Sequence, residues 1–238
     1  MYRGQTIAVV IPALNEENNI GPVIRSLPSF VDFIVVGDNG STDNTAKEAR
    51  NNGAIVICET RRGYGSACLA ALSILKKNPP AIVVFTDADG SDDPSQMEEL
   101  IRPLLLGKSD LTVASRATGI AEKGSLTSAQ RFGNWLATRL IRLFWLARFT
   151  DLGPYRAITW QALDDLHMSD PDFGWTVEMQ IKAARLGLKV SEIPANYRKR
   201  RLGKSKVGGS LCGSTLAGGK ILWWIFREKL RDLVPAKT

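Results

Sequence analysis

Residues 81–94, AIVVFTDADGSDDP, decide the fold, because an apolar run of strand length leads directly into a cluster of carboxylates. A short run rich in β-branched residues is typical of a strand buried on both faces of a parallel sheet. The polar residues that follow then lie at the carboxyl end of that strand. This is the edge where open α/β sheets bind their ligands.

Asp87 and Asp89 are two residues apart in an extended segment, so we expect their side chains to point the same way. Two like charges held together favour a cation between them. Carboxylate oxygens suit Mg2+ or Mn2+, which usually share such ligands with substrate phosphates. The sequence therefore predicts a site for a metal and a diphosphate. The alternative is a solvated acidic loop in which Asp92 and Asp93 only cap a helix that begins near Pro94.

The first half of the chain alternates between apolar strands and helical segments. We expect strands at 6–12, 33–38, 54–59, 81–87 and 110–115, and helices near 16–27, 42–52, 64–77 and 95–106. Right-handed crossovers between such units give a mostly parallel central sheet covered by helices on both faces. The predicted fold class is therefore a Rossmann-like α/β fold.

Length and composition limit the class of protein. A chain of 238 residues is long enough for one sizeable α/β domain with a short appendage. Its three cysteines form an odd set without metal-ligand spacing, which fits a reducing compartment better than a disulfide framework. The N-terminal residues lack the order of a signal peptide, and no apolar stretch approaches about 18 residues. We expect a cytoplasmic protein, or one peripheral on the cytosolic face of a membrane.

The net charge of +7 is distributed unevenly. Residues 123–150 contain no acid but four arginines, and a second basic run, YRKRRLGKSK, covers 197–206. Basic patches indicate an anionic partner, which can be nucleic acid, anionic lipid or a phosphorylated substrate.

Four motifs at the strand ends carry a resemblance. VIPALNEENN, VVGDNGSTDNT, RRGYGSA and TDADGSDDP, in this order and spacing, resemble the nucleotide-binding half of family-two inverting glycosyltransferases with the A-type fold. Among these, the chain is most similar to dolichyl-phosphate mannose and polyprenyl-phosphate glucose synthases, and the resemblance covers roughly residues 6–206.

The resemblance implies roles for individual residues. Pro12, Ala13, Glu16 and Asp38 would line the nucleoside site, Asp87, Ala88 and Asp89 would form the metal-binding D-x-D motif, and Arg116 would touch phosphate. Asp38 is also a candidate on its own, because it ends a strand where no helix cap requires a carboxylate, and it could accept hydrogen bonds from a ribose or a base.

The second half continues the resemblance on the acceptor side. Asp151, in DLGPYRAI, resembles the aspartate that opens the family's acceptor loop, and Glu178 resembles the acid in the helix that follows. Arg200, Ser205 and Lys206 match an R...SK motif that would lie over the donor diphosphate or a lipid phosphate. The alternative for this basic run is a solvated loop.

The chain departs from the family pattern at four positions. Leu14 replaces a common Tyr, Asn39 a second Asp, Tyr64 a Lys, and Ser91 a Gln or Glu. The change at Ser91 leaves the third protein ligand of the metal to water or Asp92.

Two late helices are expected to be amphipathic. In 131–149, we expect one core stripe, and on the opposite side Trp135, Trp145 and Phe149 among Arg131 and Arg142. The expected stripe consists of Phe132, Leu136, Leu140, Leu143 and Ala147. In 211–231, the expected outer arc consists of Lys220, Trp223, Trp224, Arg227 and Arg231, while Ile221 and Ile225 face away. Tryptophan interleaved with arginine favours a membrane interface, and the alternative is packing under a neighbouring element or a dimer partner.

These observations together predict a glycosyltransferase domain at 1–206, with a nucleotide-sugar half (1–117) and an acceptor half (118–206), and a C-terminal amphipathic helix at 207–238. The expected reaction is metal-dependent, inverting transfer of a hexose from a nucleotide sugar (UDP- or GDP-hexose) to a polyprenyl phosphate at a membrane surface. For a sugar hydroxyl acceptor, Asp151 or Glu178 would be the general base. The alternatives are a glycosyltransferase with a water-soluble acceptor and a non-catalytic module that binds nucleic acid. An acidic sheet edge argues against nucleic acid as a partner, and a homo-oligomer remains open.

Overall fold

The apolar runs of the first half form four parallel strands in a computed structural model that describes residues 1–202 and 211–233. They are β1 (Ile7–Ala13), β2 (Phe33–Asp38), β3 (Ile55–Cys58) and β4 (Ile82–Phe85). They pair in the order β3-β2-β1-β4. Every residue of β1 and β4 is buried, as expected for strands covered on both faces. These four predicted strands are confirmed to within two residues at each end.

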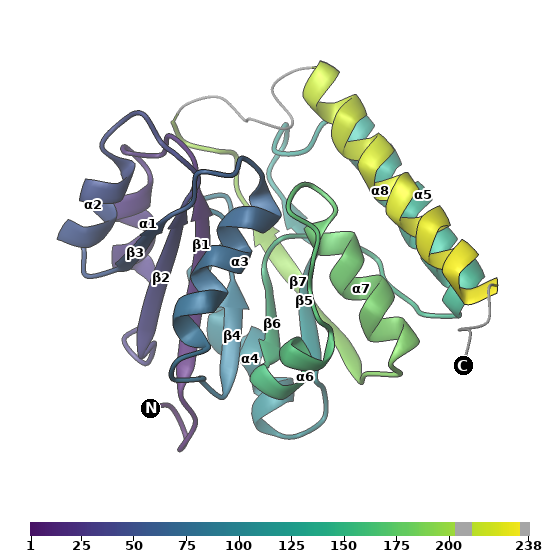
Figure 1. The fold of residues 1–238 in the computed structure, drawn as a ribbon, viewed down its shortest axis with the longest axis horizontal. Helices are drawn as coiled ribbons and strands as arrows, with labels where there is room; N and C mark the ends of the chain where they lie inside the picture. Colours follow the sequence, from purple (N-terminus) through teal and green to yellow (C-terminus); the bar gives the residue numbers. More distant parts are fainter. Residues whose placement is uncertain (203–210, 234–238) are drawn as a thin grey trace.

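Helices cover both faces of this sheet (Figure 1). They are α1 (Ile20–Ser26), α2 (Thr45–Asn51), α3 (Tyr64–Leu75) and α4 (Met97–Leu105), with a 3-10 turn at Pro94–Gln96. Ile7, Val9 and Ile11 of β1 pack with α1 and α4, whereas Ala8 and Val10 pack with α3. Strand side chains alternate between the two layers, so the predicted α/β fold is confirmed.

Three further strands complete a seven-stranded sheet within the described residues, in the order β3-β2-β1-β4-β6-β5-β7. They are β5 (Leu111–Ala121), β6 (Arg156–Thr159) and β7 (Val190–Tyr197). β6 runs antiparallel to both β4 and β5, and β7 is parallel to β5. The sequence prediction did not include β6 and β7 and ended β5 six residues too early.

The remaining helices are α5 (Ser128–Trp145), α6 (Trp160–Asp165), α7 (Trp175–Arg185) and α8 (Leu211–Leu233). α5 and α8 lie side by side, beyond the β5–β7 end of the sheet (Figure 1). These two helices and α7 share a hydrophobic cluster that includes Ile141, Ile181 and Trp224. In the described part of the chain, we find no helix whose length and hydropathy would let it cross a bilayer.

The predicted orientation of α5 is wrong in part, because Leu140 and Ala147 pack against the core cluster as expected but other members of the stripe do not. The expected core stripe was Phe132, Leu136, Leu140, Leu143 and Ala147, but Phe132 is 61 % exposed and Leu143 is 69 % exposed. The buried positions are Ala137, Thr138 and Ile141, whose smaller side chains let the helix pack closely on its neighbours. The helix ends at Trp145, and Leu146 follows in the left-handed region with φ 57°. Phe149, which was expected outside, lies beyond the helix and is buried.

The predicted orientation of α8 is right for Trp223 and wrong for Trp224. Trp223 is 50 % exposed, and the cations of Lys220 and Arg227 lie over its ring at 5.0 and 4.8 Å. Trp224 is only 2 % exposed, and its indole N–H donates to the Asp170 carboxylate. Adjacent tryptophans therefore have opposite roles, because consecutive helix positions are about 100° apart.

This difference gives a matched test of the packing of α8. We expect Trp224→Ala to lower the free energy of unfolding by about 3–5 kcal/mol, because it leaves a large cavity in the α5–α7–α8 cluster. The control Trp223→Ala should change it by less than about 1 kcal/mol, since that side chain is half exposed. Urea denaturation followed by circular dichroism measures both, and equal losses for the two variants would contradict the packing.

Candidate active site

The loop after β4 places a group of carboxylates at the carboxyl edge of the sheet. Asp92 is 5 % exposed and folds back toward the strand. It accepts hydrogen bonds from the Thr86 hydroxyl at 3.0 Å and from the Asp87 backbone N–H at 3.1 Å. Asp92 thus fixes the loop beside Asp87. Asp93 accepts a hydrogen bond from the Ser95 N–H and caps the following turn, which is the capping role that the sequence analysis gave as an alternative. We call Asp87, Asp89 and Asp92 the acidic cluster.

The acidic cluster holds more negative charge than its surroundings favour. Burial raises the pKa of Asp87 well above its usual range, and the charges of Asp92 and Asp89 raise it further. Burial also raises the pKa of Asp92 to about 6, although the Asp87 N–H opposes this. The Tyr64 hydroxyl donates to Asp87 Oδ1 at 3.2 Å and offsets only part of the repulsion. This donor set fits a divalent cation, which would favour the ionised carboxylates.

The protein ligands alone do not form a complete metal site. Among the side chains that the structure describes, in 1–202 and 218–233, no three from histidine, cysteine, aspartate or glutamate are grouped to hold an ion. A site of two carboxylates is still sufficient where substrate phosphates and water supply the other oxygens, as is common for Mg2+.

Arg200 connects the acidic cluster with the predicted nucleoside site. Its guanidinium contacts the Glu16 carboxylate and lies 3.5 Å from Asp89 Oδ2. Glu16 is itself ordered, because its backbone N–H donates to Thr45 Oγ1 at 2.7 Å and Asn19 donates to its Oε2 at 2.8 Å. The structure therefore brings together three residues that the sequence analysis selected from distant segments. Ser205 and Lys206, the rest of the basic motif, lie outside the described residues.

The other predicted nucleoside residues lie at the ends of β1 and β2. Pro12 and Ala13 are in register with Gly37 and Asp38 on the neighbouring strand. Asp38 is 4 % exposed and accepts a hydrogen bond from the Ser41 N–H at 3.3 Å.

Asn39, which the sequence analysis treated only as a departure from the family, orders the glycine-rich turn. Its Nδ2 donates to the Arg61 carbonyl at 2.8 Å, and its Oδ1 accepts from the Gly63 N–H at 2.7 Å.

Arg116 and Asp151 form a bidentate ion pair. Arg116 Nε and Nη2 donate to Asp151 Oδ2 and Oδ1, both at 2.7 Å, and the Arg116 backbone N–H also donates to Oδ2 at 2.7 Å. Burial alone would lower the pKa of Arg116, but the Asp151 charge and hydrogen bonds raise it overall, so the guanidinium stays protonated. Asp151 is 1 % exposed, and both of its oxygens are occupied. In this geometry, Asp151 positions Arg116.

Glu178 is also fully occupied. It is buried and accepts from the Ser169 N–H at 2.9 Å, the Ser169 hydroxyl at 2.7 Å and the Asp170 N–H at 2.7 Å. Lys182, one turn later on α7, lies 2.7 Å from its Oε1. None of these partners belongs to the acidic cluster. The carboxylate fixes the loop that precedes α7.

The end of β7 supplies residues that the sequence analysis did not select. The backbone of Tyr197 forms an isolated antiparallel β-bridge with that of Asp92. The Tyr197 ring lies 5.1 Å from the Arg116 guanidinium. The Arg198 N–H donates to the Ser91 carbonyl at 2.8 Å, and its side chain pairs with Asp93 at 3.1 Å. Both residues begin the basic run at 197–206, but their contacts could not be anticipated because β7 itself was not predicted.

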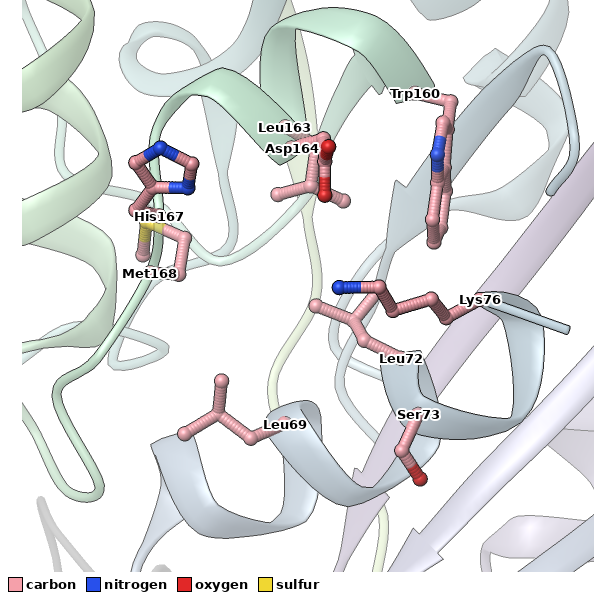
Figure 2. Close-up of a pocket in the computed structure, with 9 residues that line it drawn as sticks. All are labelled: Leu69, Leu72, Ser73, Lys76, Trp160, Leu163, Asp164, His167 and Met168. Atoms are coloured by element: carbon pink, nitrogen blue, oxygen red, sulfur yellow. The ribbon is translucent and has the colours of Figure 1, made fainter.

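A groove of about 410 Å³ lies elsewhere, between α3 and α6 (Figure 2). It is lined by Leu69, Leu72, Ser73, Lys76, Trp160, Leu163, Asp164, His167 and Met168. None of these is a predicted site residue. His167 is exposed at the groove.

Comparison with known proteins identifies the family. The model described as glycosyl transferase family 2 matches residues 8–166. The chain belongs to this family. It is 37 % identical over 220 residues to an uncharacterized glycosyltransferase of Mycobacterium tuberculosis, covering 90 % of this chain and 95 % of the relative. It is 32 % identical over 235 residues to a dolichyl-phosphate hexose transferase of Haloferax volcanii, covering 97 % of this chain and 98 % of the relative.

A solved glycosyltransferase has a similar fold. Glucosyl-3-phosphoglycerate synthase from Mycobacterium tuberculosis, in complex with Mn2+, UDP-glucose and phosphoglyceric acid, aligns with a TM-score of 0.76 and 25 % identity. The alignment covers 98 % of this chain and 82 % of that one. This family-2 chain therefore has the A-type fold, as the motifs predicted.

The raised pKa values in the acidic cluster predict that metal binding depends on pH. Protonated carboxylates do not ligate, so we expect affinity for Mn2+ to fall as pH is lowered from 7 to 5. Below the Asp92 pKa of about 6, the expected loss approaches tenfold per pH unit for each displaced proton. Titration with Mn2+ alone, followed by electron paramagnetic resonance of the free ion, avoids the titration of nucleotide phosphates. Affinity that stays constant from pH 5 to 7 would contradict the charge balance described above.

Proposed function

We propose that this family-2 glycosyltransferase moves a hexose from a nucleotide sugar, a UDP- or GDP-hexose, to a polyprenyl phosphate at a membrane surface. The observation that carries the proposal is the occupation of both Asp151 oxygens by Arg116. A sugar hydroxyl needs a general base within about 3 Å of its proton. A phosphate monoester has a second pKa near 6 and is largely dianionic at pH 7, so it can attack without one.

The two base candidates from the sequence are therefore better explained as positioning residues. Asp151 holds Arg116, and Glu178 holds the loop before α7. A phosphate acceptor also agrees with the names of two relatives, the dolichyl-phosphate hexose transferase and an undecaprenyl-phosphate mannosyltransferase of Micrococcus luteus. The latter is 26 % identical over 223 residues, which cover 88 % of this chain and 90 % of the relative.

On the donor side, Asp87 and Asp89 would hold Mg2+ or Mn2+, with Ala88 between them. When bound, the ion would supply positive charge to the departing diphosphate. The solved relative binds Mn2+ with UDP-glucose, which supports a divalent cofactor. Pro12, Ala13, Glu16 and Asp38 would bind the nucleoside.

Arg116 and Arg200 would neutralise phosphate oxygens, and Lys206 would do so from outside the described residues. In the proposed step, an acceptor phosphate oxygen forms a bond to the anomeric carbon. The bond from that carbon to the diphosphate oxygen breaks on the opposite face, which inverts the configuration. The leaving electron pair stays on the nucleoside diphosphate.

The second candidate is transfer to a small soluble acceptor. The crystallised relative with a TM-score of 0.76 contains phosphoglyceric acid beside UDP-glucose, and this favours testing phosphorylated small acceptors. Nucleic acid is not required as a partner of an enzyme from this family, and the acidic sheet edge would repel a phosphate backbone.

The proposal is tested by measuring the release of nucleoside diphosphate from a panel of nucleotide sugars. The acceptor is either polyprenyl phosphate in detergent or 3-phosphoglycerate. We expect release to depend on the polyprenyl phosphate and on Mg2+ or Mn2+. Asp89→Ala should lower kcat/KM by about 10²-fold or more, because it removes a proposed metal ligand. The control Asp165→Ala changes an exposed carboxylate on α6 and should retain activity. Full activity of Asp89→Ala refutes the metal assignment, and turnover only with the soluble acceptor refutes the lipid phosphate.

A double-mutant cycle tests whether Asp151 acts through Arg116. We expect Asp151→Asn and Arg116→Gln to lower kcat/KM with polyprenyl phosphate by similar factors, and the double variant to be no worse than either one. Each single variant should also lose about 3–5 kcal/mol in urea unfolding, because it leaves one buried charge unpaired. The double variant should recover part of that loss. A deficit for Asp151→Asn that far exceeds that of Arg116→Gln would identify Asp151 as a base instead.

A further inference from the structure

The outer sides of α5 and α8 expose an unusual number of large apolar side chains. Seven of the thirteen exposed large hydrophobic residues in the described chain lie on these helices or at the end of α5. They are Phe132, Trp135, Leu143, Leu146, Trp223, Phe226 and Leu230, with exposed fractions between 49 % and 86 %. We call these residues and the cations among them the α5–α8 surface. Apolar exposure of this density marks an interaction site.

The exposed residues form one arc on each helix. At about 100° per residue, Phe132, Trp135 and Leu143 share an arc of α5, and Trp223, Phe226 and Leu230 share an arc of α8. In Figure 1 the two helices run side by side.

Side-chain contacts hold the two helices together. Phe226 packs against Phe144 of α5 with ring centroids 5.9 Å apart. The Trp145 indole N–H donates to Asp232 at 2.7 Å, which holds the C-terminal ends of the two helices together. The two helices therefore form one packed pair that carries both arcs.

The charges on this surface are positive. The cations of the two helices are Arg131, Arg139, Arg142, Lys220, Arg227, Lys229 and Arg231. α5 contains no acid. Among the described acids of α8, Glu228 is 1 % exposed, and both it and Asp232 pair with Arg185 of α7. Glu228 also pairs with Arg227 and Arg231, and Lys220 pairs with Asp170. The carboxylates thus face the protein, and among the described residues the three arginines of α5 and Lys229 form no ion pair.

Cations and indoles are paired directly. The Arg139 guanidinium lies 5.7 Å from the Trp135 ring, and Lys220 and Arg227 lie over Trp223. Indole rings favour the headgroup level of a bilayer, and guanidinium groups bind lipid phosphates. We propose that the α5–α8 surface binds the headgroup region of an anionic lipid bilayer. A second copy of the same surface is a poorer partner, because it would place arginines against arginines.

The surface begins beside the site. Asn134, next to Trp135, donates to the Thr150 carbonyl at 2.9 Å and accepts from the Leu152 N–H at 2.8 Å. These two residues flank Asp151, the partner of Arg116. If the acceptor is a lipid phosphate, a step that rests on the proposed function, the bilayer would present that phosphate next to the Arg116–Asp151 pair.

Flotation with vesicles of phosphatidylcholine, with and without phosphatidylglycerol, tests the surface on the full chain. We expect binding to the anionic vesicles. Arg139→Glu together with Arg227→Glu should weaken it by at least tenfold, since each cation near a membrane contributes about fivefold. Trp135→Ser together with Trp223→Ser should weaken binding to both kinds of vesicle. The matched controls, Lys47→Glu with Lys108→Glu and Ile55→Ser with Leu106→Ser, change exposed residues elsewhere and should bind like the unchanged protein.

Circular dichroism and thermal melting show whether each variant remains folded, and light scattering gives the oligomeric state. Equal binding by surface variants and controls, or no binding by the unchanged protein, overturns the proposal. A dimer that only the surface variants dissociate also overturns it, and assigns the surface to a second copy. Vesicle binding without transfer to polyprenyl phosphate would contradict the proposed reaction while supporting the surface.

Discussion

The repulsion among the carboxylates after β4 is the constraint on which the site depends. Asp87 and Asp92 are held together by a backbone hydrogen bond, and Asp89 adds a third negative charge. Water cannot fully solvate charges at a partly buried strand end, so positive groups must converge there. Arg116 and Arg200 come from segments far apart in sequence, and their positions near this cluster are explained by its charge. A metal with its diphosphate would complete the same balance.

The topology of the second half brings those cations to the acidic edge. β6 runs antiparallel between β4 and β5, and Asp151 lies in the segment that leads into it. That segment reaches Arg116 on β5, so the ion pair ties the connection to the strand at the edge of the nucleotide half. β7 then returns parallel to β5, and its end contacts the loop of the acidic cluster through Tyr197 and Arg198. The site therefore combines residues from both halves of the chain, because the short strand β6 runs antiparallel to its neighbours.

The sequence predicted the nucleotide half well and the acceptor half poorly, for physical reasons. Strands such as β1 and β4 are continuous apolar runs, and their ends are marked by motifs. β6 has only four residues and contains the buried Arg156, so neither length nor hydrophobicity marks it as a strand. On α5, the large apolar residues predicted a core face that is only partly right, because Ala137 and Ile141 form the centre of the packing against α7 and α8 while Leu140 packs at its margin. Which face of an amphipathic helix is buried depends on neighbours that one helix's sequence does not contain.

The energies involved also bear on the two proposed roles of Asp151. To accept a proton as a base, the buried carboxylate would give up its pairing with Arg116, whose guanidinium lies over the Tyr197 ring. Breaking such a pair costs about 3–5 kcal/mol, which corresponds to roughly 10²–10⁴ in rate. General base catalysis contributes about the same factor, so the base role would gain nothing. A nucleophile that arrives already ionised avoids this cost and leaves Arg116 in place for phosphate, so the ion pair itself favours an anionic acceptor.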